Sequence, residues 1–412
     1  MICSPERSVA LRQLADFLPA ATRYGWQRNA VRPGHPAVSR LSPAIRHRLL
    51  SEDEVAAAVL AAHPLAQVEK LVQEIYWRRY WKSWLSLRPG VWTNYRESLT
   101  EIDQNGGGEV IARFGQDRSG NPVIDHFAKE LMETGYLHNH ARMWFAAWWV
   151  HEARLPWELG AAFFYQHLLD GDPASNTLSW RWVAGLQTPG KTYLARRANL
   201  EKYLDPGLLE SLRDGLAAFE NPTPHLPPGT VRAPVTRPVL ESPAMDPALA
   251  TGLWIHEEDL SPETSLLGDA TFRAMLVTGH GAAWRDFRFP MAKQVWLRAA
   301  LADASFRAAA HWQTEAPVYA GVELLGELVA WAGVHGLSQI VSLRPDVGPL
   351  ADALPALSHA LEGAGIRLVL VDRPRDVVLR PLATAGFFGF WENLKKRGLL
   401  PGCPVQTASA AM

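Results

Sequence analysis

The sequence predicts an all-α domain followed by a C-terminal α/β domain of the doubly wound, Rossmann-like type. In the first half of the chain, apolar side chains recur at helical spacing, whereas short continuous apolar runs alternate with helical patterns beyond residue 250. A proline-rich stretch without periodicity separates the two patterns, as expected of a linker. We therefore expect a helical domain at 1–220, a linker at 221–248, an α/β domain at 249–397 and a disordered tail at 398–412.

The composition is that of an ordinary globular chain with a large core. Of its 412 residues, 48% are hydrophobic and 20% are charged, and the 17 tryptophans are the unusual feature. The two cysteines, Cys3 and Cys403, lie near the termini, so neither a disulfide framework nor a cysteine metal site is expected. No apolar run approaches the ~20 residues of a bilayer span. We expect a cytoplasmic monomer without metal or membrane contact.

Beyond the linker, predicted strands and helices alternate. The expected strands are 252–256, 274–278, 318–321, 339–343 and 367–371. The expected helices between them are 291–311, 323–334 and 350–362. Short apolar strands joined by helices are typical of a parallel sheet with crossovers. No Gly-x-Gly-x-x-Gly follows the first strand, so an NAD-type dinucleotide site is not expected there.

The first domain should be helical from its start, with helices expected at 7–20 and 65–87. Another helix is expected near Pro43, where Ser39 or Ser42 could form the N-cap. The run 105–108 (NGGG) is expected to be a loop, and no Gly-Lys-Ser/Thr follows it, so it matches no phosphate-binding loop.

Residues 134–182 are the stretch around which this domain is organised. One face of a helix expected over 137–154 carries Asn139, Arg142, Met143, Ala146 and Val150. Asp172 is expected to cap a helix that begins at Pro173, and Asn176 and Trp180 share a face of that helix. Because polar groups among buried aromatic residues are costly unless they are paired, this stretch predicts a buried polar ligand or a buried ion network.

At these residues the chain resembles the flavin-binding core of the photolyase and cryptochrome family. The segments TGYLHNHARM, Trp157-Glu158, LLDGDPASN and WRW match that family in order and spacing, without a gap from Gly135 to Trp182. The resemblance implies FAD as cofactor. The alternative is a tryptophan-rich helical core with an incidental arginine–aspartate bridge.

The resemblance also implies which residues hold FAD. Arg142 and Asp170 would pair against the flavin ring, and Asp172 would accept a hydrogen bond from a ring N–H or a ribose hydroxyl. Asn139 and Asn176 would place amide dipoles near the ring and the adenine. The expected phosphate-binding residues are Tyr24, Val38, Ser39, Arg40, Leu41 and Ser42, with Val38 in place of the family's threonine.

The helix over 65–87 carries Glu74, Trp77 and Arg78, which resemble the family's Glu-x-x-Trp-Arg. The resemblance implies that Glu74 and Trp77, together with Trp182, contact a flipped-out lesion, whereas Arg78 supports the flavin. A simpler interpretation is an amphipathic helix with a solvated cationic edge, in which Glu74 pairs with Arg78.

Trp180 and Trp157 correspond to the first two members of the family's electron relay. The third member, normally upstream of the segment around Asp125, has no clear counterpart, because Trp92 is out of register. Residues that could substitute are Trp144, Trp148 and Trp149, although packing is the more common role of such tryptophans.

Damaged DNA, single- or double-stranded, is the partner that the resemblance implies. Lys191, Arg196 and Arg197 stand where repair enzymes place loops that touch DNA phosphates, although the residues differ. The net charge is −1, but residues 1–100 carry more Lys and Arg than Asp and Glu, which fits either a nucleic-acid partner or a solvated basic face.

The resemblance implies light-driven splitting of cyclobutane pyrimidine dimers by electron transfer from excited reduced FAD. Two alternatives remain: a cryptochrome-like blue-light photoreceptor with the same FAD site, and a structural relic without flavin. GLWIHEEDL resembles the first strand of the family's antenna domain, and residues 386–394 (GFFGFWENL) resemble its closing segment. The antenna-like domain, with a possible second chromophore, would then have moved to the C-terminus by circular permutation.

Overall fold

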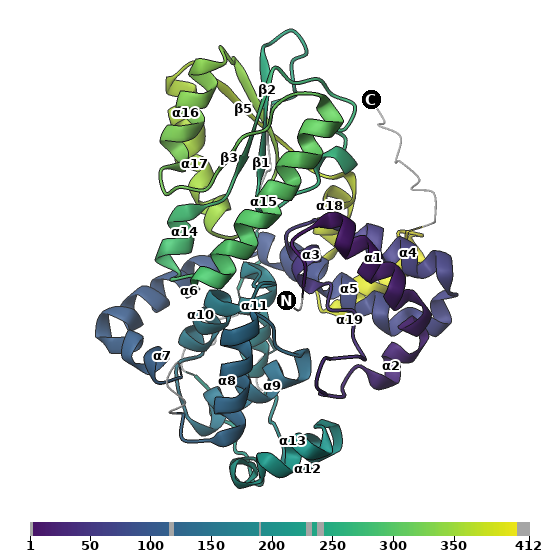
Figure 1. The fold of residues 1–412 in the computed structure, drawn as a ribbon. Helices are drawn as coiled ribbons and strands as arrows, with labels where there is room; N and C mark the ends of the chain where they lie inside the picture. The colour runs from purple at the N-terminus through teal and green to yellow at the C-terminus, as the bar shows by residue number, and fades with distance from the viewer. Residues whose placement is uncertain (1–2, 115–118, 189–190, 228–232, 237–242, 402–412) are drawn as a thin grey trace.

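The structure, a computed structural model, describes residues 3–114, 119–188, 191–227, 233–236 and 243–401. Figure 1 shows a helical part below a parallel sheet that is flanked by helices. The boundaries of the four expected segments stay predictions. Within 221–248, the described residues form no helix or strand, and Cys403 with most of the expected tail lies outside the described residues. No helix among the described residues is both long enough and apolar enough to cross a bilayer.

The helical part extends from the N-terminus to Phe219. Its α-helices are α1 (Arg7–Phe17), α2 (Tyr24–Gln27), α3 (Ser42–Arg46), α4 (Glu52–Ala62), α5 (Leu65–Ser86), α6 (Pro89–Ile102), α7 (Gly108–Phe114), α8 (Pro122–Thr134), α9 (Asn139–Ala147), α10 (Trp157–His167), α11 (Pro173–Val183), α12 (Arg197–Tyr203) and α13 (Pro206–Ser211). Shorter turns are η1 (Leu18–Arg23), η2 (Asp103–Gly107), η3 (Trp148–Glu152) and η4 (Arg213–Phe219). The long helix α5 contacts α2, α4, α6 and α11 of this part.

The N-terminus of α11 has the cap that the sequence predicts. Asp172 is the N-cap, and its Oδ2 accepts a hydrogen bond of 2.8 Å from the backbone N–H of Ser175, while Pro173 is the first helical residue. The expected cap of α3 is wrong: Leu41 is the N-cap residue, and Ser42 is already inside the helix. Ser39 instead accepts from the N–H of Leu41 at 3.4 Å, which ties a turn before the helix.

The glycine-rich run 105–108 is not a loop, contrary to the expectation. It lies in the wide helical turn η2 that joins α6 to α7. Gly106 has φ +93°, which breaks the helical path there, and glycine is the residue that adopts this conformation without steric cost. The chain therefore passes from α6 to α7 through a kink.

The α/β part contains five parallel strands in the order β3-β2-β1-β4-β5. The strands are β1 (Thr251–His256), β2 (Ala274–Thr278), β3 (Val318–Tyr319), β4 (Gln339–Leu343) and β5 (Arg367–Val371), and the helices are α14 (Gly281–Asp286), α15 (Met291–Trp312), α16 (Leu324–Val334) and α17 (Pro349–Gly363), with the short turn η5 (Pro262–Thr264) after β1. Alternate residues of β1 face opposite cores: Leu253 and Ile255 pack in the core that contains α15, and Trp254 packs with α16 and α17. The predicted five-stranded parallel sheet is confirmed, with helices on both faces.

The end of the chain leaves the sheet. After β5, the segments α18 (Pro374–Leu379), η6 (Arg380–Leu382) and α19 (Phe387–Lys396) lie against the helical part, and Figure 1 shows yellow α19 beside purple α5. Tyr80 of α5 donates a hydrogen bond of 2.8 Å to the carbonyl of Ala385, and Trp391 Nε1 donates to Glu69 at 2.9 Å. The apolar face of this helix is buried on α5, so residues 386–394 pack on the helical part, and their resemblance to the closing segment of the antenna domain stays a prediction.

Buried ion pairs join the two parts. Arg46 of α3 makes two hydrogen bonds of 2.6 Å to Glu258, which follows β1, and a third to the carbonyl of Gly171 at 2.8 Å. Arg48 and Arg79 share the carboxylate of Asp376 from α18, at 2.7 and 2.8 Å. Both guanidinium groups are fully desolvated, so each depends on its carboxylate partner.

We expect Glu258→Gln to lower the free energy of unfolding by about 3–5 kcal/mol, because it leaves the buried charge of Arg46 without a counter-ion. Urea denaturation followed by tryptophan fluorescence measures this change. The control is Arg213→Ala, which breaks an exposed pair with Glu210 and should have little effect. Equal losses in the two variants would contradict the interpretation of Arg46–Glu258 as a buried pair that joins the two parts.

Candidate functional site

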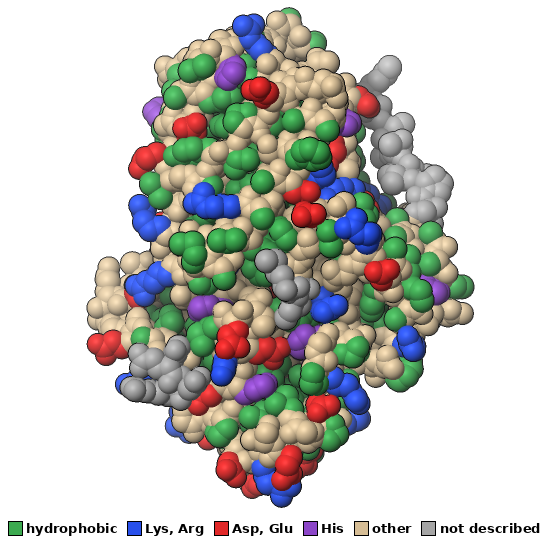
Figure 2. Space-filling view, in the orientation of Figure 1, with side chains coloured by type: hydrophobic (Ala, Val, Ile, Leu, Met, Phe, Trp, Pro, Cys, Tyr) green, Lys and Arg blue, Asp and Glu red, His purple; other side chains and the backbone are tan. Residues whose placement is uncertain are grey.

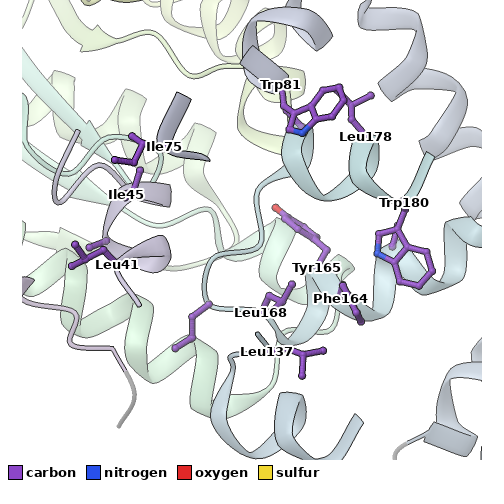
Figure 3. Packing of buried hydrophobic residues seen from close by; sticks show 14 of the residues in the cluster. Leu41, Ile45, Ile75, Trp81, Leu137, Phe164, Tyr165, Leu168, Leu178 and Trp180 are labelled. Atoms are coloured by element: carbon purple, nitrogen blue, oxygen red, sulfur yellow. The ribbon is translucent and has the colours of Figure 1, made fainter. Parts of the chain in front are cut away.

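A cavity of about 600 Å³ opens in the helical part, a size typical of small-molecule sites. Its walls come from α2, the turn before α3, α5, α9, α10 and α11, with one residue, Phe388, from α19. Figure 3 shows Leu41, Ile45 and Ile75 on one side and Phe164 and Trp180 on the other, all of which line it. Segments from both ends of the chain therefore build one cavity.

Every residue expected to hold a dinucleotide lines this cavity. They are Tyr24, Val38, Ser39, Arg40, Leu41, Ser42, Arg78, Asn139, Arg142, Asp170, Asp172 and Asn176. Glu74, Trp77, Trp180 and Trp182 line it as well, whereas Trp157 does not. The structure brings these residues together, and their individual roles stay predictions.

Arg142 and Asp170, which both line the cavity, form an ion pair. Arg142 Nη2 is 3.0 Å from Asp170, and Arg142 Nε donates to the carbonyl of Leu137 at 2.7 Å. Arg78 lies 3.8 Å from both Asp170 and Asp172, too far for a hydrogen bond. The pairing expected for Arg142 and Asp170 is present, and Arg78 lies near both Asp170 and the neighbouring Asp172.

Asp172 is buried among these cations. Its Oδ1 lies 3.9 Å from Lys82 Nζ, and its Oδ2 also accepts from the hydroxyl of Ser175 at 2.5 Å. Burial by itself would raise the pKa of Asp172, but the charges of Lys82, Arg46 and Arg78 outweigh it and lower the pKa to about 2. The pKa of Asp170 is likewise lowered, because Arg142 and Arg78 outweigh its desolvation. Both side chains are therefore anions at neutral pH.

Two amides lie on the wall from different helices. Asn176 Nδ2 donates to the carbonyl of Ala161 at 2.7 Å, which fixes the orientation of this side chain on α11. Asn139 is exposed at the start of α9. Val150, expected on the same face as Asn139, is buried away from the cavity because α9 passes into the wider turn η3 at Trp148 and loses the helical register.

The turn before α3 forms another part of the wall. Arg40 has φ +56°, a left-handed conformation that is unfavourable for a residue with a side chain. The turn is held on both sides: Gln13 donates to the carbonyl of Ser39 at 2.6 Å, and Cys3 Sγ lies 3.0 Å from that of Arg40. Strained backbone that is held in this way often occurs at binding sites.

On α5, Glu74 does not pair with Arg78. Its Oε1 accepts from Arg28 at 2.9 Å and lies 3.0 Å from Lys70 Nζ. The carboxylate is therefore held at the cavity wall by two cations that the sequence interpretation did not include. Lys70 lies one turn before Glu74 on α5, at the i, i+4 spacing that a sequence can show, whereas Arg28 follows α2 and no local pattern connects it to Glu74.

Two tryptophans that line the cavity each stack on another aromatic side chain of this protein. Trp77 stacks on Phe387 of α19 with a centroid distance of 3.9 Å and an interplanar angle of 11°. Trp182 stacks on Tyr193 at 5.5 Å and 24°. Each indole therefore has one face covered by its own chain, and only the other face can receive a ligand.

Trp180 is buried in an aromatic cluster. Its ring meets Phe164 at 5.0 Å and Trp149 at 6.0 Å, both edge-to-face. A Cβ added to Gly160 would come within 2.3 Å of this ring, so glycine is required where Trp180 packs on α10. Trp157 lies one turn earlier on α10.

The three basic residues expected to contact DNA phosphates differ in their surroundings. Lys191 and Arg196 are exposed, whereas Arg197 pairs with Glu201 at 2.8 Å and Glu220 at 2.6 Å. On the face shown in Figure 2, basic and acidic side chains are interspersed. Arg197 is therefore a weaker candidate for a phosphate contact than the other two.

The cavity has buried polar atoms that lack a partner. Arg78 Nη1 and Trp180 Nε1 have no hydrogen-bond partner among the described residues, although both belong to residues that line the wall. Buried polar atoms are rarely left without a hydrogen-bond partner, so a ligand with polar ring atoms would supply the missing partners. Together with the ion pair, the two amides and the strained turn, they fit a large planar ligand with a polar edge and phosphates. No cluster of three or more potential metal ligands occurs in the described part of the chain.

Comparison with known proteins identifies the central part of this site. Residues 71–205 match the family model described as the FAD binding domain of DNA photolyase. The deoxyribodipyrimidine photo-lyase of a Synechococcus species is 29% identical over 189 residues, which are 44% of this chain and 39% of the relative. The chain thus spans about two fifths of the length of this curated relative.

Two solved structures are similar to about half of the chain. A bacterial class III photolyase from Agrobacterium tumefaciens aligns with a TM-score of 0.41 and 25% identity, over 51% of this chain and 44% of that one. A cryptochrome from Synechocystis sp. aligns with a TM-score of 0.43 and 19% identity, over 52% and 45%.

We expect Asp172→Asn to flatten the acid limb of the stability curve. A carboxyl group whose pKa is lowered to about 2 on folding stabilises the native state above the unfolded pKa, and this contribution of about 2 kcal/mol is lost as the pH falls from about 4 toward 2. Asparagine keeps the capping acceptor, so only the charge is removed. Denaturation midpoints measured across this pH range test the effect.

The control for this measurement is Asp205→Asn, which changes a half-buried N-cap aspartate on α13. Its stability curve should keep the wild-type acid limb. An unchanged acid limb in Asp172→Asn would show that the surrounding cations do not stabilise this carboxylate.

Proposed function

The chain belongs to the photolyase/cryptochrome family with FAD as its cofactor, and on that premise we propose that it is a light-driven DNA repair enzyme that splits cyclobutane pyrimidine dimers. The observation that carries the proposal is the joint presence of Glu74, Trp77 and the FAD-site residues Arg142, Asp170 and Asp172 around one cavity. A photoreceptor needs only the flavin site, whereas repair also needs groups that bind the lesion beside it.

The contacts around the cavity support the proposed cofactor-binding roles. Arg142 and Asp170 would orient the flavin ring, and Asp172, which is fixed as a helix cap, would accept a hydrogen bond from the ring or the ribose. The amides of Asn139 and Asn176 can each present a donor or an acceptor, which suits a ring that changes its charge during the reaction. The turn over residues 38–42, together with Tyr24, would hold the phosphates.

Reduced FAD that has absorbed blue or near-ultraviolet light would supply an electron to the dimer, whose cyclobutane ring opens before the electron returns. The protein would hold the flipped-out lesion between the free faces of Trp77 and Trp182, since their other faces are covered by Phe387 and Tyr193. Glu74, held by Arg28 and Lys70, would hydrogen-bond to a pyrimidine. Trp180 would pass electrons to the cofactor when it needs to be reduced.

For the α/β part, we propose that it corresponds to the family's antenna domain, placed after the helical part by circular permutation. The sheet order β3-β2-β1-β4-β5 and its position behind the linker in the sequence support this correspondence. Binding of a second, light-harvesting chromophore belongs to the same proposal.

A cryptochrome-like photoreceptor is the second candidate function, and one contact favours it. Phe387 stacks on Trp77 inside the protein, as a base of a lesion would do. The exposed Phe388 next to it also lines the cavity, so α19 could be moved by changes at the cofactor. In this case α19 would be the element that transmits the light signal.

We expect the purified wild-type protein to contain about one non-covalent FAD per chain, since one cavity carries the binding residues. Asp172→Ala should lower the flavin-to-protein absorbance ratio after gel filtration, because it removes an acceptor of the cofactor. Asp205→Ala removes a helix cap elsewhere and should keep the ratio. A wild-type protein that is colourless and does not take up added FAD would refute the cofactor site.

With flavin occupancy held equal, Trp77→Ala should weaken binding to an oligonucleotide with a pyrimidine dimer by about 1–3 kcal/mol, the value of one stacking contact. Trp26→Ala, which removes an indole that is 71% exposed and outside the cavity, should change binding little. Glu74→Ala should mainly lower the light-dependent repair yield, since its hydrogen bond gains strength when the lesion carries the extra electron.

Both measurements need a wild-type reference with fully reduced FAD. If this protein removes no dimers from single- or double-stranded DNA in light, the repair proposal fails and the photoreceptor candidate replaces it. If Trp77→Ala and Trp26→Ala weaken binding equally, Trp77 does not stack on the lesion.

A further inference from the structure

The first described residues of the chain, 3–6, form an N-terminal arm that lies against α15 of the α/β part. Trp296 Nε1 of α15 donates a hydrogen bond of 3.0 Å to the carbonyl of Cys3, and both residues are buried. The backbone N–H of Arg7, which directly follows the arm, donates to Asp303 Oδ2 of the same helix at 3.2 Å. The N-terminal arm is therefore held on α15 at both of its ends.

The side chain of Cys3 contacts the turn before α3. Its Sγ donates to the carbonyl of Arg40 at 3.0 Å. Desolvation, with a smaller contribution from the charge of Asp170, raises the pKa of the Cys3 thiol to about 12, so this group keeps its proton at neutral pH and remains a donor. Cys3 thus accepts a hydrogen bond from the α/β part and donates one to a residue of the cavity wall.

The hydrogen bond from Cys3 restrains an unfavourable backbone conformation. Arg40 has φ +56°, and its ψ angle sets the direction of the carbonyl that the thiol holds. A residue with a side chain stays in the left-handed region only where its surroundings hold it there. Gln13 of α1 holds the preceding carbonyl, that of Ser39, at 2.6 Å. The turn over residues 38–42 is therefore kept in shape by the first helix and by the arm that precedes this helix.

Trp296 reaches the same region by a second contact. The centroid of its ring lies 5.3 Å from that of His47, the residue at the C-terminal end of α3. His47 Nδ1 is hydrogen-bonded to the carbonyl of Glu257 after β1, at 2.7 Å. The segment 40–47 is thus fixed to the α/β part at both of its ends, through Cys3 at one end and through His47 at the other. A shift of α15 is therefore transmitted to the turn.

We propose that Cys3 and Trp296 are positioning residues for FAD, which hold the turn over residues 38–42 in its binding conformation and so strengthen binding of the cofactor; this inference rests on the proposed role of that turn in holding the phosphates. Neither Cys3 nor Trp296 lines the cavity, so both act through Arg40 and not by contact with the ligand. A turn that is already ordered loses no further freedom on binding, whereas a released turn has to be ordered again at a cost in affinity.

The coupling between the arm and the cofactor works in both directions. If the closed arm strengthens binding of FAD, bound FAD must stabilise the closed arm by the same factor. The Cys3 residue is only 4% exposed, so a thiol reagent reacts with it only when the arm opens. The reaction rate of this thiol therefore reports how often the arm opens.

The first measurement is the rate at which full-length protein loaded with FAD releases the cofactor after dilution, followed by flavin fluorescence. Differences in affinity among variants appear mostly in this rate. Cys3→Ala removes the donor to Arg40 and should speed release about two- to tenfold, as expected for the loss of one hydrogen bond. Cys3→Ser keeps a donor on a side chain of similar size and should release FAD at the wild-type rate.

Trp296→Phe tests the contact of the arm with α15 and has a matched control. This variant removes the N–H that donates to Cys3 but keeps an aromatic ring beside His47, and it should speed release of FAD to a similar extent. Trp312→Phe removes an indole N–H at the C-terminal end of the same helix, where it donates to the carbonyl of Ala270 at 3.0 Å. The control should release FAD at the wild-type rate.

The second readout is alkylation of Cys3 by iodoacetamide. Cys403→Ser leaves Cys3 as the only cysteine of the chain, so the modification can be followed by mass spectrometry. Excess FAD should slow alkylation, and Trp296→Phe should speed it, whereas Trp312→Phe should not. A Cys3 side chain that only fills space in the core would react at the same rate in both tryptophan variants.

Equal release of FAD from wild type and Cys3→Ala would overturn the inference, as would equal release from the two tryptophan variants. Faster release from Cys3→Ser as well as Cys3→Ala would also overturn it, because the donated hydrogen bond would then not be the cause. Should Cys3→Ala not fold, alkylation of Cys403→Ser protein at a rate independent of FAD is enough to overturn it.

The proposed function fails on other observations. A protein that takes up no FAD refutes the cofactor site and the role of the arm with it. A protein with reduced FAD that removes no dimers in light refutes repair alone. A protein that binds FAD and repairs dimers, but shows the same release and alkylation rates in all variants, overturns only the role of the arm.

Discussion

Lys82, near the C-terminal end of α5, is the buried charge on which both the cavity and the interface between the two parts depend. Its Nζ lies 3.9 Å from Asp172 at the cavity and 3.6 Å from Asp346 in the turn after β4. Beside it, Arg79 pairs with Asp346 at 2.9 Å. Charges removed from water cost several kcal/mol each unless they are paired, so α5 is stable here only with an anion on each side. The position of the cap of α11 is therefore linked to docking of the α/β part.

Because of this link, α5 forms part of both the cavity wall and the interface between the helical part and the α/β part. Successive residues of a helix point about 100° apart, so Arg78 faces the cavity while Arg79 faces the interface. Glu74 lies one turn before Arg78 and Trp77 directly precedes it, and both line the cavity. The turn after β4 and the helix α18 hold α5 in place through Asp346 and Asp376.

The sequence predicts what is encoded locally. The strands of the sheet, the cap at Asp172 and the cofactor residues of 134–182 follow from periodicity, helix-cap chemistry and a continuous family motif. Contacts between distant segments could not be predicted, because an apolar or charged face does not specify which element covers it. Arg46–Glu258 and Trp77–Phe387 are of this kind, and so is the packing of residues 386–394 on α5.

The division between local and distant information has a functional consequence. Five of the twelve residues expected to hold the dinucleotide come from the continuous stretch 134–182, and the other seven come from Tyr24, residues 38–42 and Arg78, all in the first hundred residues of the chain. Phe387, in contrast, covers one face of Trp77 and so determines which face stays open to a ligand. Phe387 belongs to the last helix of the described chain, which is held on α5 by the hydrogen bonds of Tyr80 and Trp391. A helix attached at the end of the chain can change its packing without disturbing the cofactor. The choice between binding a lesion and transmitting a light signal would therefore be made at α19, while the photochemistry stays the same.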